Sequence, residues 1–157
     1  MWIPLVGFSC LRKQEYPLEP VITYDGHMYL DTLDQLGNTV RLCRVDLGFT
    51  DGDGDIGLRE TDITGPFHPD STYHNNLWVG YYEFIDQQWV EKVLIPSYSA
   101  RIPYLTPRGQ NKALKGVITY DINITNVAVD TFKFDFVLVD RSLQHSNKVE
   151  SPMLFKN

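Results

Sequence analysis

The sequence has few cysteines and few basic residues. Only Cys10 and Cys43 occur among 157 residues, and two cysteines do not make the disulfide framework of a small secreted scaffold. Lys and Arg together number 14 against 20 Asp and Glu, which gives a formal net charge of −6. Because nucleic-acid binding depends on basic patches that neutralise phosphates, this balance argues against a nucleic-acid partner.

Long hydrophobic runs and catalytic motifs are also missing. No apolar run approaches the roughly 20 residues that a membrane-spanning helix needs. The chain contains no Gly-x-Ser-x-Gly, no phosphate-binding Gly-x-x-x-x-Gly-Lys and no His-Glu-x-x-His. The four histidines lack the spacing of zinc ligands: they are His27, His68, His74 and His145. We therefore expect a non-catalytic protein.

Alternation of apolar and polar residues with a period of two predicts β-strands. In residues 41–49 the apolar face carries Cys43, Val45, Leu47 and Phe49, so Cys43 is expected to be a core residue with a buried thiol. In residues 131–139 the aromatic and apolar side chains again fall on one face. No stretch shows a helical period over three turns, and the aromatic content of 13% also favours strands.

Further strands are expected between clusters of turn-forming residues. They cover residues 21–30, 76–85, 89–95, 114–124 and 148–155. About seven strands in one unit, residues 21–157, predict an all-β, immunoglobulin-like two-sheet sandwich, with a closed barrel as the alternative. Residues 96–112 are expected to be irregular, and a projecting loop there is one possible protein-binding surface.

The N-terminal residues resemble the end of a bacterial lipoprotein signal peptide. An apolar run, residues 2–8, is followed by Ser9 and Cys10, and then by a polar stretch to Pro20. In such proteins the cysteine is lipidated and holds a soluble domain at the membrane. The resemblance implies a signal remnant and tether in residues 1–20, lipidation of Cys10, and a location in the cell envelope, outside the cytoplasm. The run is short and no Lys or Arg precedes it, so a short N-terminal strand with an incidental cysteine is the alternative.

An acidic loop follows the strand predicted at residues 41–49. Asp51, Asp53 and Asp55 alternate with two glycines. Ca²⁺ binds six to eight oxygen ligands, and glycines let a loop curl around it. The loop is not an EF-hand, because Ile56 replaces the glycine and Asp62 the glutamate of that motif. A Ca²⁺ site is predicted, with an acidic β-turn as the alternative.

A fourth aspartate is expected near this loop. In an immunoglobulin-like sandwich the connection after the second strand and the one after the sixth lie at the same end. Asp140 begins the latter connection. The predicted Ca²⁺ ligands are therefore Asp51, Asp53, Asp55 and Asp140, although Asp140 is equally suited to capping its own turn.

Three segments together resemble a known family. They are residues 49–58, residues 101–116, and residues 139–142 with Ser146 and Asn147. The chain resembles a lipoprotein family of Bacteroidota-type bacteria that is predicted to be immunoglobulin-like and often carries an Asp-Gly-Asp-Gly-Asp loop. The resemblance implies fold and location, and it implies no enzymatic activity.

These observations predict a membrane-anchored structural or protein-interaction module, stiffened by Ca²⁺, whose partner is another envelope protein. The alternative is a glycan-binding module that uses exposed aromatic rings. The candidate rings are Trp78, Tyr81, Tyr82, Trp89 and Tyr98. These rings could instead pack in the core. Tyr81 lies on the opposite strand face from Trp78 and Tyr82, and one of the two faces must be buried.

Overall fold

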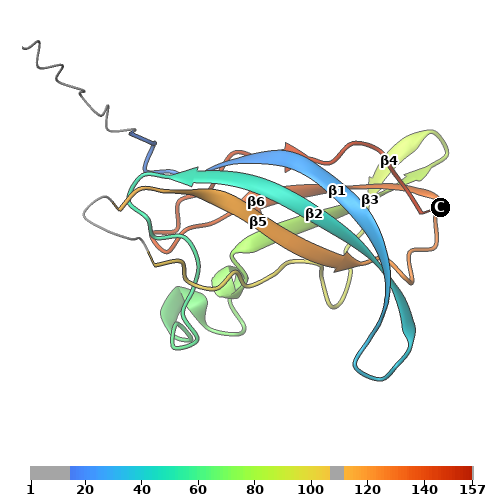
Figure 1. Ribbon diagram of the computed structural model, residues 1–157, viewed down its shortest axis with the longest axis horizontal. Coiled ribbons are helices and arrows are strands. Elements are labelled where there is room, and N and C mark those ends of the chain that lie inside the picture. Colours follow the sequence, from blue (N-terminus) through green and yellow to red (C-terminus); the bar gives the residue numbers. More distant parts are fainter. Residues whose placement is uncertain (1–14, 107–111, 157) are drawn as a thin grey trace, which may run out of the picture.

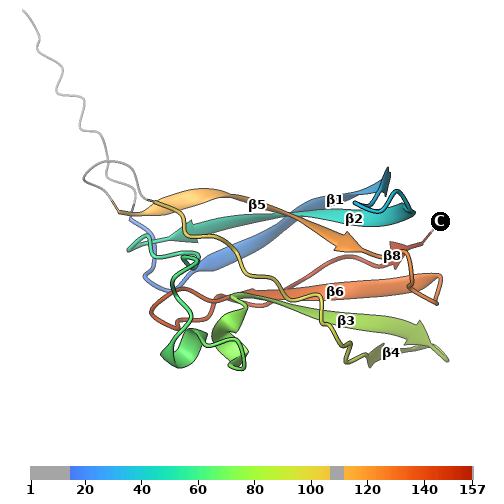
Figure 2. The same ribbon diagram turned by 90° about the horizontal axis from the view of Figure 1, so that it is seen from below.

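Two antiparallel sheets pack face to face in the computed structural model, which describes residues 15–106 and 112–156 (Figures 1 and 2). The first sheet has the order β1-β2-β5, formed by β1 (Val21–Leu33), β2 (Thr39–Asp51) and β5 (Leu114–Asn123). The second has the order β4-β3-β6-β7, formed by β3 (Leu77–Ile85), β4 (Gln88–Glu91), β6 (Thr131–Leu138) and β7 (Val149–Glu150). Strand β8 (Leu154–Phe155) also pairs with β6.

The chain crosses between the sheets in the manner of an immunoglobulin-like sandwich. Strands β1 and β2 lie in one sheet, β3 and β4 in the other, β5 returns to the first, and β6 to β8 complete the second. Two short 3₁₀ helices, η1 (Gly65–Phe67) and η2 (Thr72–His74), lie in the connection from β2 to β3. The predicted all-β two-sheet sandwich is confirmed, and the closed barrel is wrong. Within the described ranges, no helix has the length and apolar character to cross a bilayer.

The core lies between the two sheets, as the alternation predicted. Cys43, Val45 and Leu47 of β2 have no exposed surface. From β6, the inner face contributes Phe132, Phe134, Phe136 and Leu138, all without exposed surface. Burial raises the pKa of the Cys43 thiol to about 11, so this side chain is an inert core residue.

The strand expected at residues 148–155 is interrupted. Pro152 has no N–H to donate to a ladder, so β7 and β8 are separate. Ser151 maintains the contact with β6 instead: its N–H donates to the Phe134 carbonyl at 2.9 Å, and its Oγ accepts from the Phe134 N–H at 3.0 Å. The strand expected at residues 89–95 is also shorter, since β4 ends at Glu91.

The connection after β2 packs beside residues 101–105, part of the segment for which a projecting loop was one possibility. The Leu58 N–H donates to the Ile102 carbonyl at 2.9 Å, and the Tyr104 N–H donates to the Leu58 carbonyl at 3.0 Å. Ile102 is buried, so residues 101–105 line the sandwich and do not project from it. Residues 107–111 lie outside the described part of the chain.

One end of the sandwich brings together segments far apart in sequence. Strand β2 ends there at Asp51, and the connection after β6 begins there. The segment of residues 15–20 reaches the sheets at this same end (Figure 1). Asn147 joins the two sheets beside it: its side chain accepts from the Ile22 N–H and donates to the Ile22 carbonyl, both at 2.9 Å. This end holds the predicted metal ligands.

Candidate metal centre

Three of the four predicted ligands converge in the structure. Asp51, Asp55 and Asp140 each place a carboxylate oxygen within 4.8 Å of the others. Asp51 has no exposed surface and Asp140 only 1%. Asp53 is not one of these three, although its charge acts on both Asp51 and Asp140. The structure therefore brings the two connections together, as the fold argument predicted.

Each converging carboxylate uses one oxygen for a hydrogen bond. Asp51 Oδ2 accepts from the Asp55 N–H at 2.9 Å, and Asp55 Oδ2 accepts from the Ser142 hydroxyl at 2.7 Å. Asp140 Oδ1 accepts from the Gln144 N–H at 2.7 Å. The capping role considered for Asp140 is thus confirmed, but it occupies only one of the two oxygens.

The other carboxylate oxygens are buried without a hydrogen-bond donor among the described residues. They are Asp51 Oδ1, Asp53 Oδ1, Asp55 Oδ1 and Asp140 Oδ2. A buried acceptor without a partner costs about 1–3 kcal/mol, and more when it is charged. Hydrogen bonds that orient carboxylates while leaving one oxygen of each toward a common point are typical of metal ligands. The three converging residues offer hard oxygen donors with no sulfur or nitrogen among them, which suit Ca²⁺ best.

The electrostatics also favour a cation. Burial, and then the neighbouring carboxylates, raise the pKa of Asp51 and of Asp140 to about 6. The pKa of Asp53 is raised mainly by burial and by Asp55, although Lys112 lowers it in part. Arg141 does not reach this cluster as a counterion, because its guanidinium pairs with Asp62 at 3.3 Å. Asp62 stands at the last ligand position of the EF-hand comparison, but here its carboxylate pairs with Arg141.

Of the two glycines that alternate with the aspartates, Gly54 has the left-handed backbone expected of a curled loop and Gly52 does not. Gly54 and Gly57 have φ of +73° and +88°, a left-handed region that favours glycine. Ser142 and Gln144 were missed as supporting residues. Their only sequence signal is their position two and four residues after Asp140, which became informative once Asp140 was placed beside the loop.

The raised pKa values predict an unusual pH dependence for the metal-free protein. Between the ordinary value of 3.8 and the folded value of about 6, Asp51 and Asp140 bind more protons in the folded state than in the unfolded state. Their contribution to the free energy of unfolding should therefore fall as pH rises from about 4 to about 7. Urea unfolding in chelator at several pH values, for the wild type and Asp51→Asn, measures this contribution as the difference between the two profiles. Superimposable profiles would contradict it.

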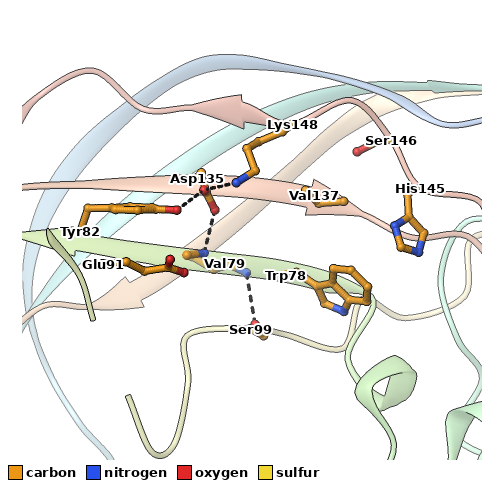
Figure 3. Close-up of a pocket in the computed structure, with 11 residues that line it drawn as sticks. Trp78, Val79, Tyr82, Glu91, Ser99, Asp135, Val137, His145, Ser146 and Lys148 are labelled. Atoms are coloured by element: carbon orange, nitrogen blue, oxygen red, sulfur yellow. Dashed lines mark hydrogen bonds and ion pairs between the residues drawn. The ribbon is translucent and has the colours of Figure 1, made fainter. Parts of the chain in front are cut away.

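A second feature is a groove on the outer face of β3 and β6, of about 460 Å³ (Figure 3). Trp78 and Tyr82 lie toward its two ends, with Asp135 between them, and Gly80 also lines it. Asp135 is only 5% exposed, because it accepts from the Gly80 N–H at 3.1 Å, the Tyr82 hydroxyl at 2.7 Å and the Lys148 ammonium at 2.7 Å. A side chain on Gly80 would collide with Asp135.

The aromatic rings proposed for glycan stacking are already in contact with other groups. Tyr81 is 4% exposed and packs with Tyr98 at a centroid distance of 5.6 Å. The Lys133 ammonium lies 5.3 Å from the Tyr82 ring centre and 5.2 Å from that of Trp89. Trp78 contacts the His145 and Tyr73 rings at 4.8 and 5.6 Å. Tyr81 and Tyr98 therefore belong to the core side, and the other three rings to the outer face.

Comparison with known proteins adds no relative. The chain matches no protein-family model, no curated protein and no solved structure. Cys10, the predicted lipidation site, lies outside the described residues.

Proposed function

We propose that the chain is a non-catalytic immunoglobulin-like module that binds Ca²⁺ at one end and acts outside the cytoplasm as a structural or protein-interaction domain. The observation that supports this most is the set of buried, unpaired oxygens on Asp51, Asp53, Asp55 and Asp140. These aspartates lie on two separate connections. Hydrophobic packing gives no reason to gather so much negative charge there, whereas a bound cation does.

A cation here would stiffen the sandwich. Asp51 ends β2 of the first sheet, whereas Asp140 follows β6 of the second. Ca²⁺ bound to both would link the sheets through ionic bonds where the core ends, and it would remove the repulsion between the carboxylates. The loops at this end would then present one conformation to a partner, which for an anchored protein is another envelope protein.

The anchoring part of this proposal rests on the N-terminal resemblance to lipoproteins. A lipid on Cys10 would hold the chain at the membrane without a spanning helix. The described structure is compatible with this arrangement, because the sandwich begins at β1 and residues 15–20 lead into it.

Calorimetric titration of Ca²⁺ into the chelator-treated chain tests the metal site. We expect saturable binding near one equivalent, weakened at least about tenfold by Asp140→Asn, because that change removes a charged ligand. Asp70→Asn makes the same change on a side chain that is 92% exposed and should bind as the wild type does. Absence of saturable binding by calorimetry and by NMR titration would reject the proposal.

The glycan alternative remains a separate prediction. The groove between Trp78 and Tyr82 is where a sugar would bind on this face. The contacts of these rings with His145 and Lys133 leave less open ring surface than the sequence suggested. The metal-binding module is therefore the function that the geometry supports best.

A further inference from the structure

The N-terminal segment lies directly against the acidic loop. Gly52 stands between Asp51 and Asp53, and a Cβ placed on it would lie 2.5 Å from the Tyr16 carbonyl oxygen and 2.6 Å from that of Pro17. Gly52 is not among the residues with a left-handed backbone. The turn itself therefore does not require glycine at position 52. The glycine is needed because the N-terminal segment approaches so closely.

The approach places electronegative atoms against an acidic loop. Both carbonyl oxygens are acceptors, and none of the hydrogen bonds between described residues ends on either of them. The neighbouring Asp51 and Asp53 each carry a buried oxygen that likewise lacks a donor within the described ranges. Oxygens gathered around one short loop repel one another, and a cation bound between them would offset that repulsion.

We propose that the Tyr16 and Pro17 carbonyl oxygens complete the coordination of the metal, so that the bound cation holds the N-terminal segment onto the sandwich. This inference rests on the proposed function. Ca²⁺ takes six to eight oxygen ligands and commonly includes backbone carbonyls. The three converging carboxylates alone fall short of that number. The two carbonyl oxygens would bring the set to five, and water or Asp53 would supply the sixth oxygen.

If this is so, the residue at which the chain becomes rigid depends on whether the metal is bound. Pro20 is buried, Val21 pairs with Thr50, and Ile22 is held by Asn147, so the chain is fixed from Pro20 onward by the sandwich itself. Leu18 and Glu19 are exposed between that point and the carbonyl contact. With the metal bound, rigidity extends back to Tyr16. The cation then sets the direction in which the domain leaves its N-terminal tether.

Backbone ¹⁵N relaxation of the full chain, with Ca²⁺ or with chelator, tests whether the metal orders the N-terminal segment. In the wild type, the Leu18 and Glu19 amides should show the heteronuclear NOE of a flexible segment in chelator and that of the sandwich strands in Ca²⁺. The turn at residues 34–38, at the other end of the β1–β2 hairpin, is the internal control and should not respond. Ordering of the acidic loop without ordering of Leu18 and Glu19 would overturn the inference while leaving the metal site intact. Failure of Ca²⁺ to bind at all would reject the proposed function, and this inference with it.

The variant Gly52→Ala tests the same inference independently. The added methyl group collides with the two carbonyl groups, so the segment must move away and Ca²⁺ affinity should fall about tenfold, with loss of the ordering of Leu18 and Glu19. Gly65→Ala strains a left-handed backbone (φ +59°) but meets no atom within 4 Å, so it controls for lost stability alone and should leave affinity and ordering unchanged. Unchanged affinity and unchanged ordering in Gly52→Ala would overturn the inference, and the wild-type comparison remains decisive if that variant does not fold.

Discussion

Ca²⁺ at 100 times its dissociation constant should raise the free energy of unfolding by about 2.7 kcal/mol, which for a chain of this size corresponds to roughly 5–10 °C in melting temperature. The physical reason is that the folded state assembles carboxylates from two connections, whereas the unfolded chain holds Asp140 far from Asp51. Thermal unfolding in Ca²⁺ and in chelator, at neutral pH, measures the difference.

The difference in stability between Asp51→Asn and the wild type should change sign between chelator and Ca²⁺. In chelator the variant should be at least as stable as the wild type, because it removes a buried charge whose pKa is raised to about 6 while keeping an oxygen for the Asp55 N–H. In Ca²⁺ it should be less stable than the wild type, because a charged ligand is missing. Equal melting temperatures for both proteins in both solutions would show that the cluster is an ordinary acidic turn.

Phe134→Ala should lower the free energy of unfolding by about 3–5 kcal/mol, the range for deleting a fully buried aromatic side chain. Phe134 has no exposed surface, and its ring packs against Tyr81, Tyr98 and Phe132 at centroid distances of 5.5–5.7 Å. The cavity would lie where β3, β6 and the segment after β4 meet, so the surrounding side chains cannot readily fill it.

Equilibrium urea unfolding, followed by tryptophan fluorescence, measures the loss. Phe155→Ala removes the same side chain from a position that is 52% exposed and should cost far less. Similar losses for the two variants would contradict the burial of the inner face of β6.

The faces of the strands could be predicted from sequence because the period of a strand is two. Alternation in β2 placed Cys43 and Leu47 inside, and alternation in β6 did the same for Phe134. Strand ends were less predictable. The break between β7 and β8 follows from Pro152, but the bonds by which Ser151 keeps contact with Phe134 across the break are not visible in local sequence.

For the candidate metal site, too, sequence and structure each decided a part. The Asp-Gly alternation marked Asp51, Asp53 and Asp55 as candidate ligands, and the strand count suggested Asp140. Only the tertiary structure separates Asp62, which pairs with Arg141, from Asp140, whose second oxygen has no donor in the described part of the chain. It alone also places the Tyr16 and Pro17 carbonyl groups against Gly52.

By itself, the sequence determined the all-β class, the inner faces of the main strands and the acidic loop, because each of these depends on residues close together in the chain. The tertiary structure decided which distant groups meet at the end of the sandwich and which aromatic rings enter the core. Those contacts depend on the order in which strands from two sheets are stacked, and strand order is set by the packing of the whole chain.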